Sequence, residues 1–221
     1  MKKKIHIQRI PLPFASLYEK ATRLAKDTYY RNVAEEVISH LTAGILLDLG
    51  TGPGYLPIEI VKRSSEIKID GIDLSGTLIK TARLNAFKAG VSDQLHFQVG
   101  NAAKLRFEDD AYDMVISTGI LHMLKDPVKV LQECHRVLKP GSEAWVYDPA
   151  QVTSQIDIRA WGDSLTFQEK LFFKLFRLFS RLNPPHVYTK EQIEEMLGSM
   201  RFDEYTIEEG DREIRIKLRK S

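Results

Sequence analysis

The chain has 221 residues, of which 43% are hydrophobic and 28% are charged, and its formal net charge is +2. This length suffices to bury one complete core, and the nearly balanced charge does not by itself indicate a nucleic-acid partner. The sequence has no apolar run long enough to cross a membrane, and its single cysteine, Cys134, excludes an internal disulfide framework and suits a reducing cytoplasm, where we expect the protein to work.

Hydrophobic patterns predict strands that alternate with helices from residue 45 onward. Ser75 is expected to cap the second helix, which Gly90 ends, and Asp126 with Pro127 opens a third. In that third helix Val130, Leu131, Cys134, Val137 and Leu138 repeat at helical spacing, and Pro140-Gly141 is expected to end it. The predicted strands are 45–49, 67–72, 95–99, 112–117 and 144–147, and the helices begin at 55, 75 and 127. This alternation predicts a parallel sheet with helices on both faces.

A glycine-rich turn follows the first predicted strand, in the sequence LLDLGTGPGYLPIEI from Leu46 to Ile60. A dinucleotide-binding turn needs a third small residue three positions after its second glycine, and here Tyr55 occupies that place. The segment also lacks the lysine and hydroxyl of a phosphate-binding P-loop. Both common nucleotide motifs are therefore disfavoured.

The remaining pattern, D-x-G-x-G-x-G from Asp48 to Gly54, resembles the first motif of class I S-adenosylmethionine (SAM) methyltransferases. The resemblance implies that the turn surrounds the methionine half of SAM and that Asp48 orients it. A glycine-rich turn without a ligand is the alternative. The implied cofactor contacts in this region are Asp48, Gly50, Thr51, Gly52, Gly54 and Tyr55.

The second strand ends in GIDLS, from Gly71 to Ser75, which continues the resemblance. Asp73 lies about twenty residues beyond the turn, where an acid can accept hydrogen bonds from ribose hydroxyls. The resemblance implies that Asp73 holds the ribose of SAM and that Leu74 packs against adenine. A helix-capping role is the alternative for Asp73, and the two roles can coexist.

The third strand leads into VGNAAKLRF, from Val99 to Phe107, which resembles the family's adenine-binding segment. Asn101 stands where the family has an acid, and an amide can still donate to and accept from the adenine edge. Ala102 would contribute a backbone N–H. Asn101 could equally be a loop residue that bonds its own backbone.

The fourth strand leads into ISTGILHMLKDP, from Ile116 to Pro127, which in the family flanks the methyl group and the substrate. The resemblance implies that Ser117, Thr118 and Gly119 line the cofactor cleft. His122 is the candidate general base, because an imidazole can exchange protons near neutral pH. A structural role for a lone histidine is the more common alternative.

The stretch HRVLKPGSEAWVYDP, from His135 to Pro149, resembles the family's turn into the fifth strand, with Ser142 in place of its second glycine. Asp148 ends that strand and could face a substrate cleft. We favour a solvated turn acid before Pro149.

Two N-terminal segments, 13–21 and 27–37, resemble the lid helices of small-molecule methyltransferases. They place Tyr18, Tyr29 and Tyr30 as candidates for contact with SAM or substrate, since aromatic faces attract cations such as a sulfonium. Tyr30 is included among the expected cofactor contacts. Helix packing is the alternative for each tyrosine.

Segment 164–182 combines five phenylalanines with one basic face. We favour a helix that packs on the sheet edge or the lid; a lipophilic substrate tunnel, a dimer seam or contact with an anionic membrane surface are the alternatives. Asn183-Pro184-Pro185-His186 lies too far along the chain for the base-methylating motif N-P-P-[YF]. The remaining patterns predict a helix over 189–198 and strands over 202–208 and 213–218.

The resemblance implies an α/β fold with a doubly wound, mostly parallel seven-stranded sheet and an antiparallel last strand. We expect a single domain over 1–221, with lid helices (1–43), a SAM-binding core (44–150), a helical cap (151–187) and a C-terminal helix and strand pair (188–221).

The expected activity is transfer of the SAM methyl group to a small-molecule acceptor, which leaves S-adenosylhomocysteine. No metal and no nucleic acid are expected, and the chain is expected to be a monomer or homodimer. The alternatives are a non-catalytic SAM-binding protein, an RNA or protein methyltransferase, and another nucleoside-using transferase such as an aminopropyl transferase.

Overall fold

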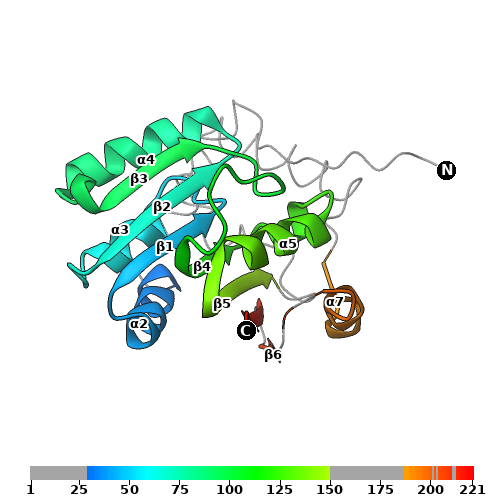
Figure 1. Cartoon of the computed structure of the whole chain (residues 1–221). Coiled ribbons are helices and arrows are strands. Elements are labelled where there is room, and N and C mark those ends of the chain that lie inside the picture. Colours follow the sequence, from blue (N-terminus) through cyan, green and yellow to red (C-terminus); the bar gives the residue numbers. More distant parts are fainter. Residues whose placement is uncertain (1–28, 150–186, 201, 203, 211–212) are drawn as a thin grey trace.

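A seven-stranded sheet organises the chain in the computed structural model, which describes residues 29–149, 187–200, 202, 204–210 and 213–221 (Figure 1). The strand order is β3-β2-β1-β4-β5-β7-β6. β1 pairs in parallel with β2 and β4, and β7 is antiparallel to both of its neighbours. The strands are β1 (Gly44–Leu49), β2 (Ile67–Asp73), β3 (Leu95–Val99), β4 (Tyr112–Thr118), β5 (Leu138–Pro149), β6 (Glu204–Glu209) and β7 (Glu213–Arg219). The predicted fold class is confirmed.

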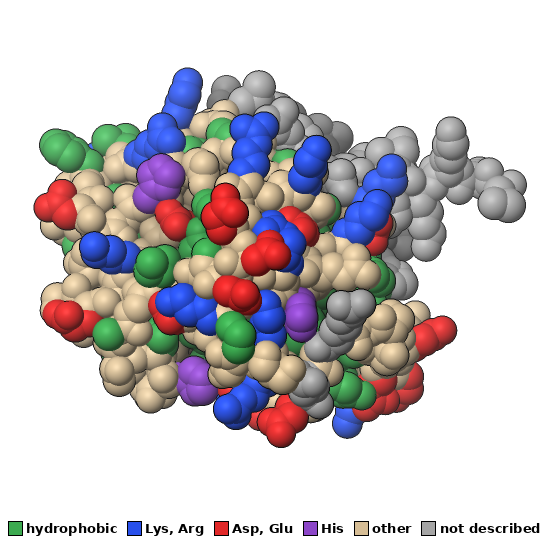
Figure 2. All heavy atoms as spheres, viewed as in Figure 1, with side chains coloured by type: hydrophobic (Ala, Val, Ile, Leu, Met, Phe, Trp, Pro, Cys, Tyr) green, Lys and Arg blue, Asp and Glu red, His purple; other side chains and the backbone are tan. Residues whose placement is uncertain are grey.

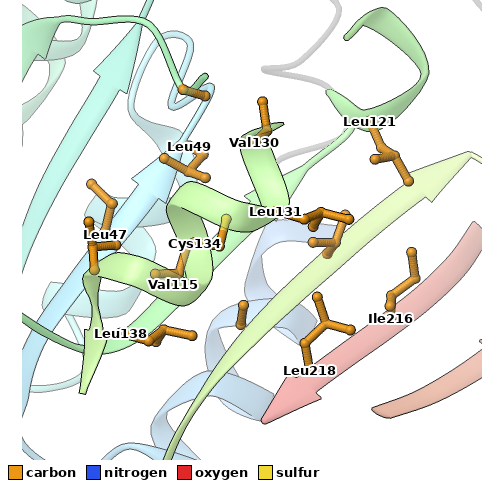
Figure 3. Packing of buried hydrophobic residues seen from close by; sticks show 14 of the residues in the cluster. Leu47, Leu49, Val115, Leu121, Val130, Leu131, Cys134, Leu138, Ile216 and Leu218 are labelled. Atoms are coloured by element: carbon orange, nitrogen blue, oxygen red, sulfur yellow. The ribbon is translucent and has the colours of Figure 1, made fainter. Parts of the chain in front are cut away.

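Helices cover both faces of this sheet, because alternate residues of each strand point to opposite sides. Leu46 of β1 belongs to a core with α2 (Arg31–His40), α3 (Tyr55–Val61) and α4 (Gly76–Ala89). Leu47 belongs to the opposite core, with α5 (Pro127–Val137) and α7 (Lys190–Leu197). Figure 3 shows α5 side chains, among them Leu131 and Cys134, packed against residues of the sheet.

The predicted helix ends are largely confirmed. The Ser75 hydroxyl accepts the backbone N–H of Leu78 at 3.4 Å, and Gly90 ends α4 in the left-handed conformation. The carboxylate of Asp126 accepts the N–H of Lys129, with Pro127 in the first turn of α5. Thr189 and Gln192 form a capping box at the start of α7.

The end of α5 differs from the prediction. The helix stops at Val137, and Leu138 already begins β5 and pairs with Tyr112 of β4. Pro140-Gly141 therefore lies inside the β5 segment, where the register with β4 shifts between Tyr112 and Met114. Leu138 fits the helical pattern, but it is fully buried as the first residue of β5.

A polar cluster fastens α2 to β5 and β7. The Glu36 carboxylate accepts hydrogen bonds from Lys217 at 2.7 Å and from the Tyr147 hydroxyl at 3.1 Å. Burial by itself would raise the pKa of Glu36, but these two donors outweigh it and the pKa lies below its usual value. The cluster holds α2, and with it the neighbouring Tyr30, at a fixed place over the sheet.

Charge is mixed over the face that carries α5. Figure 2 shows acidic and basic side chains intermingled there, in keeping with the ion pairs of Arg136 with Asp109 and Glu133. Within the described residues no helix is long and apolar enough to cross a membrane. The predicted features at Tyr18, 164–182 and 183–186 lie outside the described residues.

Candidate functional site

The glycine-rich turn joins the carboxyl ends of β1 and β2. The backbone N–H groups of Gly50 and Thr51 both donate to the carbonyl of Ile72 at 2.9 Å. The N–H of Gly52 donates to Oδ2 of Asp73 at 3.1 Å. These bonds hold the turn between β1 and α3 against the end of the second strand, where a parallel α/β sheet commonly binds its ligand.

Gly54 is required by packing as well as by backbone conformation. Its φ is +78°, and a Cβ at this position would lie 2.9 Å from Cζ of Phe97 and 3.0 Å from Cβ of Ala82. Gly54 is not among the described residues that line the neighbouring pocket. Its expected role as a direct cofactor contact stays a prediction.

A pocket lies beside this turn and brings together residues from three parts of the chain: Tyr30, the stretch 48–56 and Thr118. It has about 280 Å³ of empty space, part of which is open to solvent. Seven predicted residues line the pocket, together with Pro53 and Leu56, which the sequence did not single out: Tyr30, Asp48, Gly50, Thr51, Gly52, Tyr55 and Thr118.

Asp48 carries the most perturbed carboxyl of the pocket. It is 2% exposed, and burial raises its pKa to about 7, with a further contribution from the charge of Asp73. The Thr51 hydroxyl is near enough to favour the ionised form, although neither Oδ1 of Asp48 nor Oγ1 of Thr51 makes a hydrogen bond of normal geometry to the described residues. Buried polar atoms of this kind are stabilised by a ligand that donates hydrogen bonds or carries positive charge.

Asp73 is fixed by two backbone donors. Its Oδ2 accepts the N–H of Gly52, and its Oδ1 accepts the N–H of Ser75 at 2.7 Å. An ionised carboxylate offers about four acceptor positions, and these two backbone bonds set its orientation. Leu74 follows Asp73 directly, half-buried at the end of β2.

Asp73 and Leu74 do not line this pocket, and neither do four other predicted residues. Oδ1 of Asn101 accepts the N–H of Ala103 at 3.0 Å, which is the loop bond considered above as its alternative role. Ala102 is buried in the hydrophobic core between the sheet and α5. The Ser117 hydroxyl donates to the Leu49 carbonyl, on the other face of the sheet. Gly119 donates its N–H to the Tyr147 carbonyl at 2.7 Å. Their roles toward a cofactor stay predictions.

His122 pairs with Asp148, and this corrects the expectation for Asp148. His122 lies in a short 3-10 turn, η3 (Leu121–Met123), after β4. Its Nδ1 is 3.1 Å from Oδ1 of Asp148, and its backbone N–H donates to Oδ2 at 3.0 Å. Asp148 is only 2% exposed, so the favoured solvated turn acid is wrong. Its place in step with buried Ala144 and Val146 is the signal that predicts an inward side chain.

Aromatic rings stand beside the pocket. The ring centroid of Tyr30 is 5.3 Å from that of Tyr29 and 6.4 Å from that of Tyr55. Burial, with the nearby charge of Glu213, raises the pKa of Tyr29 far above its usual value, so its phenol stays neutral. Over the part of the chain that the structure describes, no group of three or more His, Cys, Asp or Glu side chains could hold a metal ion.

Comparison with known proteins identifies relatives of this chain. A family described as "Methyltransferase domain" matches residues 42–202. The ubiquinone/menaquinone biosynthesis C-methyltransferase UbiE of Geotalea daltonii is 31% identical over 124 residues, which cover 55% of this chain and 52% of that protein. The arsenite methyltransferase of Rattus norvegicus is 28% identical over 209 residues, covering 78% and 56%. The chain thus spans about half the length of the curated relatives it matches.

Solved structures share the fold. A Methanococcus maripaludis protein, provisionally described as a SAM-dependent methyltransferase, matches with a TM-score of 0.73 at 23% identity, over 100% of this chain and 96% of that one. The phosphoethanolamine N-methyltransferase 2 of Haemonchus contortus, in complex with SAM, matches with a TM-score of 0.66 at 15% identity, over 86% and 52%. At these identities the likeness concerns the architecture alone.

Proposed function

Because this chain belongs to the methyltransferase-domain family, we propose that it transfers the methyl group of SAM to a small-molecule acceptor. The observation that carries the proposal is the pocket at the glycine-rich turn. Buried Asp48 and the backbone of Gly50 to Gly52 line it beside the aromatic ring of Tyr30, and Asp73 accepts the N–H of Gly52 from the end of β2. These groups suit a ligand that carries both positive charge and hydroxyl groups.

Each group has a role that its chemistry supports. Asp48 would accept hydrogen bonds from the cationic amino-acid part of SAM, and the opposite charge would lower its raised pKa. Asp73 would accept the ribose hydroxyls, since its carboxylate is already oriented by Gly52 and Ser75. The rings of Tyr30 and Tyr55 would border the positively charged sulfur.

When bound, SAM supplies a methyl group on a positively charged sulfur, which needs little further activation. The chain then has to align the acceptor, exclude water and remove a proton where the acceptor carries one. His122 is the proposed base, because it lies in the loop that follows the pocket residue Thr118. Asn101, Ala102, Ser117 and Gly119 remain proposed cofactor neighbours.

The acceptor is proposed to be a small molecule. The names of two relatives, a quinone-biosynthesis C-methyltransferase and an arsenite methyltransferase, support this class. The formal net charge of +2 and the mixed charges on the face that carries α5 give no support for a nucleic-acid acceptor (Figure 2). The single cysteine supports the proposal that the protein works in the cytoplasm.

Methyl transfer can be measured directly. The full chain would be incubated with SAM carrying a tritiated methyl group and with a panel of quinols, amines, carboxylates, arsenite and tRNA. The proposal predicts label in one of the small molecules and formation of S-adenosylhomocysteine. Label in tRNA alone would contradict the small-molecule class. Binding of SAM with no labelled product would favour a non-catalytic SAM-binding protein.

A further inference from the structure

Asp148 holds both the main chain and the ring of His122. One carboxylate oxygen, Oδ2, accepts the backbone N–H of His122 at 3.0 Å, and the other, Oδ1, lies 3.1 Å from ring Nδ1. The two contacts fix the ring relative to the backbone that carries it. A histidine held in this way has one ring nitrogen engaged and one, Nε2, left for another partner.

The contact with a carboxylate decides which ring nitrogen of His122 carries the proton. Asp148 points to the α5 face of the sheet, in step with Ala144 and Val146, and it is almost completely removed from water. An ionised carboxylate can only accept, so Nδ1 has to be the donor and Nε2 keeps its lone pair. In the described part of the chain, His122 is the one Lys, Arg or His side chain with a nitrogen within 4.0 Å of the Asp148 carboxylate.

Tyr188 is a second titratable group near Asp148. Burial raises the pKa of its phenol, and the negative charge of Asp148 adds to the effect. The phenol therefore stays neutral and adds no second negative charge beside the carboxylate. The charge of Asp148 is thus compensated by hydrogen bonds, of which the one from Nδ1 depends on the tautomer of His122.

The ring of His122 remains reachable from outside. Its side chain is 18% exposed, and it follows β4 at the same edge of the sheet as the glycine-rich turn. Thr118, four residues before it, lines the pocket. Nε2 is therefore the nitrogen that an acceptor at this edge would meet.

Resting on the proposed function, we infer that Asp148 is a positioning residue that locks His122 in the Nδ1-protonated tautomer, so that Nε2 can take a proton from the methyl acceptor. As the acceptor atom forms its bond to the methyl carbon, the carbon–sulfur pair stays with sulfur and the acceptor's proton moves to Nε2. The positive charge that leaves sulfur then resides on the imidazolium, which Asp148 stabilises.

The tautomer can be read without any methyl transfer. The full chain would be labelled with ¹⁵N in its six histidines, and long-range ¹H–¹⁵N spectra would be recorded on the neutral ring. The signals of His122 are those lost in His122→Gln. The inference predicts a protonated Nδ1 and an unprotonated Nε2 in the wild type.

Asp148→Asn is the informative variant. The amide oxygen can keep the backbone N–H of His122, and the amide nitrogen then donates to Nδ1, which forces the proton to Nε2. The spectra should therefore show the opposite tautomer. A wild-type ring with its proton on Nε2, or the same tautomer in both proteins, overturns the inference.

Asp113→Asn is the matched control. Asp113 also accepts one backbone N–H, from Ile45 at 2.8 Å, and one side-chain donor, from Lys139 at 2.7 Å, but it lies at the opposite end of β4. Its replacement should leave the His122 tautomer unchanged. A change of tautomer in both variants would show a general structural effect and would overturn the positioning role.

Turnover separates this inference from the proposed function. With an acceptor that the wild type methylates, Asp148→Asn should lose about 100-fold or more in kcat while its affinity for S-adenosylhomocysteine is unchanged. Unchanged kcat overturns the inference. If the wild type binds no S-adenosylhomocysteine, the proposed function fails, and the base role of His122 fails with it. The spectra would still decide whether Asp148 sets the tautomer of His122.

Discussion

The backbone N–H of Gly52 donates to Oδ2 of Asp73 across a distance of 3.1 Å, joining the turn after β1 to the end of β2. Because Asp73 also accepts the N–H of Ser75, its carboxylate is oriented before any ligand arrives. A fixed acceptor therefore lies next to Gly52, which lines the pocket beside the turn.

Replacement of this acceptor should weaken SAM binding. We expect the Kd for SAM to rise about 10- to 100-fold in Asp73→Ala, since a hydrogen bond to a charged group contributes about 1.5–3 kcal/mol. Calorimetric titration measures this. Asp70→Ala is the control, because Asp70 lies on the same strand but bonds Tyr112 and His96. Equal affinities in wild type and Asp73→Ala would refute the placement of the ribose.

The buried carboxyl of Asp48 predicts a specific pH dependence of stability. Burial raises its pKa to about 7 in the folded chain, whereas an exposed Asp has a pKa of about 4. Between these values the folded protein binds a proton that the unfolded chain has lost, so the contribution of Asp48 to stability is present below pH 4 and is lost as the pH rises toward 7.

Asp48→Asn should remove this loss, because an amide stays neutral. Its free energy of unfolding should match that of the wild type near pH 4 and exceed it by up to about 4 kcal/mol near pH 8. Urea unfolding at both pH values measures the difference. The same variant should bind SAM more weakly, since it lacks the negative charge. A variant less stable than the wild type at pH 8 would contradict the raised pKa.

The crowded environment of Gly54 predicts a large cost for one added methyl group. Gly54→Ala should lower the free energy of unfolding by about 2–4 kcal/mol, from the left-handed backbone and from contact with Phe97 and Ala82. Gly90 has a similar φ of +70° but nothing within 4 Å of the added atom, so Gly90→Ala should cost only about 1–2 kcal/mol. Equal losses in urea unfolding would show that packing at Gly54 is unimportant.

The attachment of α2 predicts a link between stability and ligand affinity. Glu36→Ala leaves Lys217 and Tyr147 without their acceptor and should cost about 1–3 kcal/mol of folding free energy. SAM affinity should fall as well, because Tyr30 precedes α2 and lines the pocket. Glu35→Ala, an exposed neighbour on α2, is the control for both thermal unfolding and titration. A fall in stability without any change in affinity would show that Tyr30 is held independently.

The sequence could predict most of the fold because the decisive patterns are local. Apolar patterns predict the strands and α4, and the capping residue Ser75 and the helix-ending Gly90 predict the ends of α4. The end of α5 could not be located in this way. Leu138 continues the helical pattern, but its pairing with Tyr112 depends on a strand more than twenty residues earlier.

The sequence predicts the part of the site that one continuous motif supplies. It predicts less well the contacts between residues that are distant in the sequence. The turn from Asp48 to Gly52 and the distant Tyr30 and Thr118 do line one pocket. The burial of Asp148 was missed, because a single acid before a proline is typical of a turn. Only the pairing of β5 with β4 and β7 places that carboxylate inside, next to His122.

The central claim is that the pocket at the glycine-rich turn binds SAM, and calorimetric titration of the full chain with SAM and, separately, with NADH tests it most directly. We predict saturable binding of SAM at one site per chain and no binding of NADH. The absence of SAM binding, or tighter binding of NADH, would contradict the account.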